Sequence, residues 1–352
     1  MMSANYISTL MLSSSLRSSI TNNQAALTKA SKEATTGRFA DVGLELGTGT
    51  GRDLALRADF NFADQLVDTN ELVSGRLDVT QNRITQLGTT ASEFLKNLIA
   101  ARDADSGAKI ILPSASANLQ DLIGALNVSY NGAYLFGGIN TQTVPVANYV
   151  AGSTSKNALD ADFAAIPPTG FGFPQSSASV STITPAQMQT FLNNTLDPEF
   201  ASPAWNTNWS TATDQTLSSR ISTTEVVDSS VSANQPGFRK LAEAYTMLTD
   251  LGNTSLSKDT FQVVVDKAIS LVSGAINDLA VLGGTVGSIQ QRVTGATEKL
   301  KIQKDILNNQ IVKLEAVDPA EASVRVNTLQ TQIQTALALT SQLQKISLIN
   351  YL

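Results

Sequence analysis

The chain has 352 residues and a formal net charge of −6, and it contains neither cysteine nor histidine. The negative charge argues against a nucleic-acid partner, which would need a strongly basic face. Without cysteine there are no disulfides, thiol nucleophiles or zinc–thiolate sites, and without histidine the commonest general base and metal ligand are missing. We therefore expect no cofactor, no metal and no nucleic acid.

The hydropathy pattern predicts neither a membrane span nor a cleaved signal peptide. No run of about 18 apolar residues occurs anywhere in the chain. Leu10-Met11-Leu12 is the longest apolar run near the start, and no basic segment precedes it. We expect a protein that is cytoplasmic, or that leaves the cell by a route without a cleaved signal.

Residues 4–36 are predicted to form an amphipathic helix that ends at Gly37, because apolar residues recur there at three- and four-residue spacing. This stripe consists of Leu12, Leu16, Ile20, Leu27, Ala30 and Ala34. A helix start is predicted at Asp318-Pro319, where Asp318 can cap and Pro319 suits the first turn. The apolar residues that follow it are Val326, Leu329, Ile333, Leu337, Leu343, Ile346, Leu348, Ile349 and Leu352. Neither end can bury its stripe alone, so the two are expected to pair.

Residues 39–53 are expected to form a flexible connector, because Gly43, Gly47, Gly49 and Gly51 crowd the segment. The glycines resemble a phosphate-binding loop only superficially. The segment lacks the Lys-Ser/Thr pair and the G-x-G-x-x-G spacing, and no apolar strand precedes it.

Residues 55–103 carry the clearest heptad pattern and predict a long helix in a rod. The seam positions are Leu66, Asn70, Val73, Leu77, Thr80, Ile84, Leu87, Ala91, Phe94, Leu98 and Ala101. Asn70 and Thr80 are interpreted as residues that fix the register of helix pairing. A further helix is predicted over residues 114–135, after Pro113, and leads into Tyr134-Leu135-Phe136-Gly137-Gly138.

Between residues 141 and 235 the composition changes, and seven of the ten prolines and both tryptophans fall in this region. Helical periodicity is replaced by short Ser/Thr-rich segments with turn signals, which predicts an irregular, β-leaning insert with one short helix near 185–192. Disorder is the competing interpretation, which the aromatic residues disfavour.

Helical periodicity returns at Pro236-Gly237. One apolar face follows at Phe238, Leu241, Tyr245 and Leu248, and a strict seam runs from Phe261 to Leu282. Gly283-Gly284 is expected to break this helix, and a last stretch begins at Val286. The pattern predicts a mainly α-helical protein with three parts: a terminal paired-helix domain (1–45 with 300–352), a helical rod (46–140 with 236–299) and a solvent-facing insert (141–235).

Four motifs resemble the flagellin superfamily, and within it the flagellin-like hook-associated members. They are Gln24-Ala25-Ala26-Leu27 with Thr36-Gly37-Arg38, the Tyr134–Gly138 turn with Thr141 and Pro145, Asp318-Pro319-Ala320-Glu321, and Ser347-Leu348-Ile349-Asn350-Tyr351-Leu352. Ile349 and Asn350 depart from the family's terminal pattern, and the segment after Arg38 is longer and richer in glycine. The resemblance covers roughly residues 1–140 and 236–352.

The resemblance implies a secreted, non-enzymatic structural protein of the bacterial flagellum, exported unfolded through the type III channel without a cleaved signal peptide. It implies self-assembly into a layer between hook and filament, with the hook-side junction protein, flagellin and an export chaperone as partners and no membrane partner. The stripe residues Leu12, Leu16, Ile20, Leu27, Leu329, Ile333, Leu337, Leu343, Leu348 and Leu352 are the candidate assembly interface.

Three alternatives remain open at this point. The nearest is flagellin itself, the filament subunit. A soluble coiled-coil scaffold would share the helical pattern but would not explain the insert or the apolar C-terminus. An enzyme would have to rely on carboxylates such as Asp103 and Asp105, which more simply cap or solvate a turn.

Overall fold

The computed structural model describes the backbone of residues 9–104 and 106–349, and the side chains of residues 11–104 and 106–343. The protein is mainly α-helical, as predicted, with long helices toward both ends of the chain. The chain divides into two compact units, residues 1–65 with 300–352 and residues 66–299, which are described separately below.

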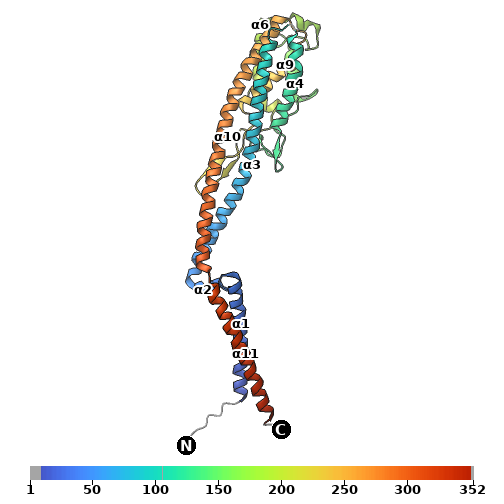
Figure 1. The fold of residues 1–352 in the computed structure, drawn as a ribbon. Coiled ribbons are helices and arrows are strands. Elements are labelled where there is room, and N and C mark those ends of the chain that lie inside the picture. The colour runs from blue at the N-terminus through green and yellow to red at the C-terminus, as the bar shows by residue number, and fades with distance from the viewer. Residues whose placement is uncertain (1–8, 105, 350–352) are drawn as a thin grey trace. The chain divides into compact units, whose positions relative to one another are not determined.

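In the first unit the N-terminal and C-terminal helices pair, as the sequence predicted. Helix α1 (Thr9–Thr36) and helix α11 (Pro319–Ile349) run antiparallel and lie side by side (Figure 1). Helix α11 begins where expected, because the side chain of Asp318 accepts a hydrogen bond of 2.8 Å from the backbone N–H of Ala320. The terminal stripe of the sequence is thus covered by another helix of the same chain.

The glycine-rich segment is not the flexible connector that was expected. It forms helix α2 (Val42–Leu46) and the 3₁₀ turn η1 (Gly47–Gly49), and helix α3 (Thr50–Ala101) begins directly after it. Asp41 caps α2 by accepting from the N–H of Leu44 at 3.0 Å, and the hydroxyl of Thr50 donates to the Gly43 and Gly47 carbonyls. Local side-chain caps therefore outweigh the conformational freedom of the glycines.

In the second unit, α3 lies antiparallel to helix α10 (Lys258–Glu315), as the heptad pattern predicted (Figure 1). All eleven seam positions from Leu66 to Ala101 are buried. Polar contacts fix the register: Asn70 Nδ2 donates to Thr297 Oγ1 at 3.1 Å, and Gln290 Nε2 donates to Asp78 Oδ1 at 2.6 Å. The buried Asn70 also donates to the carbonyl of Ile221, so it ties the helix pair to the insert.

Helix α10 does not break at Gly283-Gly284, contrary to expectation. The apolar seam continues on both sides of the pair, with Leu279 and Val286 both buried. Packing along the seam outweighs the propensity cost of two glycines, about 1 kcal/mol each. Gly283 also faces α3 closely, since a Cβ there would lie 3.3 Å from Gln81 Nε2.

Helix α4 (Gly107–Leu126) and helix α9 (Pro236–Asp250) pack against each other and complete the helical part of the second unit. The predicted face of α9 is buried. The predicted bounds of α4 were wrong: the helix starts before Pro113 and ends at Leu126. Its buried positions Ile111, Ala115 and Leu119 continue one apolar stripe on both sides of the proline. Packing of this stripe therefore outweighs the helix-breaking tendency of Pro113.

A tight hairpin follows α4 where continued helix had been expected. Strand β1 (Ser129–Tyr130) pairs antiparallel with strand β2 (Ala133–Tyr134). Asn131 and Gly132 connect them with φ angles of 50° and 78°, the left-handed conformation that two-residue hairpins favour. The Asn-Gly pair was the signal that could have predicted this turn.

The insert contains more helix than strand, so its expected β character is limited. Its strands are β3 (Ser218–Arg220) and β4 (Val226–Asp228), which form an antiparallel pair. Its helical segments are α5 (Thr154–Ala164), η2 (Ala178–Thr182), α6 (Pro185–Phe191), η3 (Leu192–Leu196), α7 (Asp197–Glu199) and α8 (Ala204–Asn208). The predicted helix near Pro185 is confirmed as α6, where Thr184 and Gln187 form a capping box.

Aromatic side chains form the core of the insert. Trp205 and Trp209 are buried and stack with ring centroids 5.6 Å apart, and Tyr149 stacks on Trp209 at 5.1 Å. The indole N–H of Trp205 donates to Asn234 Oδ1 at 2.9 Å, so its polar atom is satisfied. Burial of these aromatic side chains thus stabilises an insert whose helices and strands are short.

Helix α10 is long and apolar enough, by composition, to qualify as a candidate membrane span among the described residues. This criterion is weak evidence, since core helices meet it as well. In α10 the apolar positions that recur at helical spacing, such as Val265, Val272 and Leu279, are buried within the protein.

Candidate assembly surface

The paired helices of the first unit meet along a regular seam. On α1 the seam positions are Leu16, Ile20, Asn23, Leu27, Ala30 and Ala34, all of them buried or half-buried. On α11 they are Ala322, Val326, Leu329, Ile333, Ala336, Thr340 and Leu343. The alternating steps of three and four residues on each helix are the spacing of a two-helix seam. Only alanines in this seam are fully buried, and the leucines and isoleucines are half-buried.

Most of the predicted interface residues that the structure describes lie in this seam. Leu16, Ile20, Leu27, Leu329, Ile333 and Leu343 are half-buried there, and Leu12 is 41% exposed. Leu337 does not follow the predicted stripe: it is 52% exposed, and Ala336 occupies the inward position. The reason is that 336, not 337, continues the steps from 329 and 333. The side chains of Leu348 and Leu352 lie outside the described residues.

Where these helices adjoin α3 and α10, a buried carboxylate holds three segments together. Glu315, at the end of α10, is inaccessible to solvent and pairs with Arg38 and Arg57. Arg57 also bonds Asp53 Oδ2 at 3.1 Å. Hydrogen bonding to Glu315 raises the pKa of Arg57 against the lowering effect of burial. We call Arg38, Arg57 and Glu315 the carboxylate node.

Backbone hydrogen bonds reinforce the carboxylate node. The N–H of Phe39 donates to the carbonyl of Glu315 at 2.9 Å, and the N–H of Val317 donates to the carbonyl of Gly37 at 2.9 Å. Gly37 takes a φ of 66° here, which a side chain would strain. The chain segments just after α1 and just after α10 therefore form a small two-stranded bridge.

A second buried carboxylate, Glu33, lies on the same side of α1 as Ala30. It pairs with Arg325 of α11 at 3.2 Å and accepts from the N–H of Ala40 at 3.2 Å. Sequence reasoning passed over Glu33 and Glu315 because it followed apolar residues. The available signal was the position of each: a charged residue that falls on the inward face of an amphipathic helix needs a buried partner.

The first unit also carries many exposed apolar side chains for its size. Exposed fractions between 41% and 72% occur at Met11, Leu12, Leu44, Leu54, Phe62, Ile302, Ile306, Val312, Val324, Leu337 and Leu339. Single exposed leucines are normal, but this density, together with half-buried seam leucines, is typical of a surface that packs against other chains.

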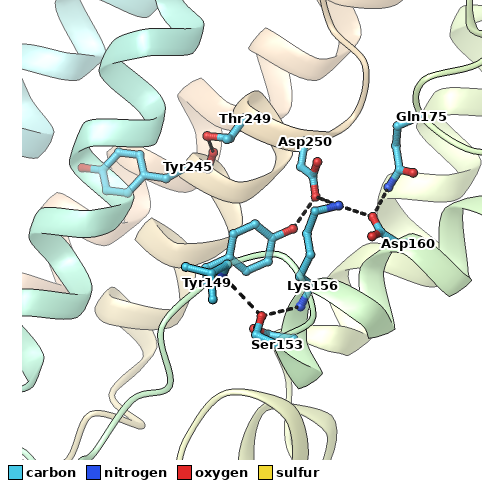
Figure 2. Close-up of polar contacts among 10 residues, drawn as sticks. Tyr149, Ser153, Lys156, Asp160, Gln175, Tyr245, Thr249 and Asp250 are labelled. Atoms are coloured by element: carbon cyan, nitrogen blue, oxygen red, sulfur yellow. Dashed lines mark hydrogen bonds and ion pairs between the residues drawn. The ribbon is translucent and has the colours of Figure 1, made fainter.

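Within the second unit, a polar cluster lies where the insert meets α9 (Figure 2). The hydroxyl of Tyr149 donates to Asp250 Oδ2 at 2.5 Å, and Lys156 Nζ contacts the same oxygen at 2.8 Å. Lys156 also pairs with Asp160, which accepts from Gln175 Nε2 at 2.8 Å. Burial, and then Asp250, raises the pKa of Tyr149 well above its usual range, so the phenol keeps its proton and fastens the insert.

In the part of the chain that the structure describes, no group of three or more acidic residues is arranged to hold a metal ion. The polar groups of Figure 2 are paired with one another instead. Their arrangement serves attachment of the insert.

Comparison with known families identifies the two helical ends. Residues 7–141 match the bacterial flagellin N-terminal helical region, and residues 269–352 match the bacterial flagellin C-terminal helical region. The two matches together cover more than half of the chain and include α1, α11 and the carboxylate node. The chain belongs to the flagellin superfamily, whose members are structural, non-enzymatic components of the bacterial flagellum.

The fold is also similar to that of a solved structure from Vibrio parahaemolyticus, provisionally described as a flagellar hook-associated protein. The match has a TM-score of 0.52 and covers 76% of this chain and 97% of that chain, at 8% sequence identity. At that identity the likeness concerns the fold. No protein of curated function matches the chain by sequence.

Proposed function

We propose that the chain is a hook-associated junction protein that is exported to the flagellum and joins hook to filament by self-assembly through its terminal helices. The observation that carries the proposal is the α1–α11 pair, whose seam leucines are only half-buried and whose outer surface is rich in exposed apolar side chains. Covering those side chains with neighbouring subunits would stabilise an assembly. The hook-side junction protein, flagellin and an export chaperone are the proposed partners.

We propose that the assembly interface comprises the ten stripe residues named in the sequence analysis. We also propose that the chain has three functional parts: the paired terminal helices, the helical rod and the insert. Leu16→Asp and Leu337→Asp should both block incorporation into flagella, because each places a charge on a surface that becomes buried. Ile166→Asp, at an 83% exposed position of the insert, is the matched control. Normal incorporation of both leucine variants would contradict the proposal.

The filament subunit is the competing function, since flagellins share the family. Immunogold labelling of flagella that carry an epitope in the insert separates the two. A single band of label at the boundary between hook and filament supports the junction protein. Label along the whole filament supports flagellin.

A further inference from the structure

We propose that a pocket in the insert binds an uncharged sugar, a mono- or disaccharide unit. The pocket has a volume of about 370 Å³, near the lower end of the range for small-ligand sites. All its lining residues belong to the second unit, and none belongs to the surface proposed for assembly, so this inference stands independently of the proposed function.

The floor of the pocket is aromatic. Phe171 and Phe173 are half-buried, with ring centroids 6.2 Å apart and planes at 29°, and Phe171 rests on buried Phe191 at 5.0 Å. The negative faces of aromatic rings attract the weakly positive C–H groups of a sugar ring. The rings are held from below by Phe163, at 4.7 Å from Phe171, so the platform exists before a ligand arrives.

Glycine at position 170 lets the chain close around this platform. A Cβ on Gly170 would lie 2.3 Å from the carbonyl oxygen of Asp162, so a larger residue would push the Phe171 loop away from α5. The backbone N–H of Phe171 donates to the carbonyl of Phe163 at 2.8 Å. These contacts fix the position of the ring.

The polar rim lacks charge, which determines the class of ligand. Of the described residues that line the pocket, the polar side chains are Thr182, Gln187 and Thr190, and none is ionisable. Burying a charged ligand without an opposite charge is costly, so the pocket favours an uncharged one.

The hydrogen-bonding atoms that the lining threonine side chains offer are acceptors. Thr182 and Thr190 donate their hydroxyl protons to the carbonyls of Ser179 and Ala186, at 2.7 and 2.9 Å, which leaves oxygen lone pairs for a ligand. Pro167 and Pro168 have no backbone N–H to offer. A ligand rich in hydroxyl donors matches this rim.

The same argument disfavours a proline-rich peptide, the other common ligand of aromatic and proline-lined grooves. Such a peptide presents carbonyl acceptors and needs donors from the protein. The oxygen of Gln187 is used by the N-terminal cap of α6, where it accepts from the N–H of Thr184 at 2.9 Å, so its Nε2 group is the donor that this side chain offers. One amide donor would leave most peptide carbonyls unsatisfied.

The test measures saturation-transfer NMR signals of maltose, cellobiose and diacetylchitobiose with the full chain at millimolar sugar. We expect transfer to the ring C–H protons of at least one of them. Phe173→Leu, which removes a ring but keeps an apolar side chain, should weaken binding about tenfold. Thr190→Val, which removes one acceptor and keeps the shape, should weaken it about fivefold.

Ile166→Ala is the matched control, since Ile166 is exposed beside the pocket and does not line it, and this variant should bind as the wild type does. Fluorescence of the buried Trp205 and Trp209 reports whether the insert stays folded. If Phe173→Leu unfolds the insert, sugar binding by Thr190→Val tests the proposal. Absence of transfer to all three sugars, transfer undiminished in both variants, or binding of a polyproline peptide in place of sugar would each overturn the proposal.

Discussion

Glu243 of α9 is a buried acid whose neighbours require it to hold a proton. Its side chain is 5% exposed and hydrogen-bonds Asp197, which Lys267 Nζ contacts at 2.7 Å. Apart from this contact, Glu243 Oε1 and Asp197 Oδ1 have no other partner in the described chain. Burial, followed by Asp197, raises the pKa of Glu243 to about 9, against the lowering effect of Lys267 and Lys240. At neutral pH the carboxyl group of Glu243 therefore keeps its proton.

This proton makes the stability of the second unit depend on pH. The folded pKa of about 9 exceeds the ordinary value of 4.5 for a glutamate, so the folded state binds more protons than the unfolded state between pH 4.5 and pH 9. The free energy of unfolding should therefore rise as pH falls from 9 toward 4.5. Asp162, whose pKa burial and Glu199 raise to about 6, adds an effect of the same sign below pH 6. Urea denaturation at pH 5, 7 and 9 measures the trend.

Glu243→Gln should stabilise the second unit at pH 7 by about 1–3 kcal/mol, because the amide keeps a donor for Asp197 and removes the cost of protonation. Its stability should also vary less between pH 5 and 9. Glu93→Gln, at an exposed position of α3, is the control that should change neither quantity. A wild-type stability that rises with pH across this range would contradict the assignment.

Glu315 should be essential to the first unit, because it is the buried member of the carboxylate node. Replacing it with alanine would leave Arg38 without its carboxylate and Arg57 with Asp53 alone, and should cost about 1–3 kcal/mol, the lower part of the range for buried pairs because both arginines are partly exposed. Hydrogen exchange of the α1 amides measures this loss. Glu45→Ala, which breaks the exposed pair with Lys29 at 2.6 Å, should leave the exchange of the α1 amides close to that of the wild type, because solvent screens this pair.

At the scale of elements, the two adjacent glycines of α10 give a matched pair of substitutions. A Cβ on Gly284 would meet nothing within 4 Å, so Gly284→Ala should stabilise the helix by about 1 kcal/mol. Gly283→Ala should gain less, since its Cβ would meet Gln81 Nε2 at 3.3 Å and displace that side chain. Thermal denaturation of the two variants side by side checks the order, and a larger gain at 283 would refute it.

Sequence periodicity predicted the long helices well because their apolar seams are regular over many turns. The failures came where packing or a local cap outweighs residue preference. Pro113 and Gly283 lie inside helices whose buried stripes continue past them, and Asp41 and Thr50 organise a segment that its glycines would leave loose. The insert has no long period, so its aromatic pocket and its helices could not be derived from spacing.

The whole molecule consists of two units, and the second should fold without the first. Its core, which runs from Val73 to Ala296, is formed by residues of that unit alone. Removing residues 1–36 and 319–352 should therefore leave the fluorescence melting transition of Trp205 and Trp209 unchanged. A large fall in that transition temperature would show that the terminal helices support the insert.

Of the candidate assembly surface, the sequence predicted the pairing of the two ends and most of the seam residues. It missed Glu33, Glu315 and their arginines, because a charge on an apolar face looks like an interruption until its partner is known. The sequence pattern also could not predict that Ala336, and not Leu337, faces α1. Which of two adjacent residues faces inward depends on how the two helices pack against each other.

The carboxylate node also sets an order of events in time. Arg38 and Glu315 are 277 residues apart in the chain, so the node cannot close until Glu315 is available. In a chain that emerges from its N-terminus, α1 waits unpaired while residues 66–299, which contain the entire core of the second unit, have already appeared. Contacts of such long sequence separation form slowly. The end of the molecule that is made first is therefore the last to acquire its fold.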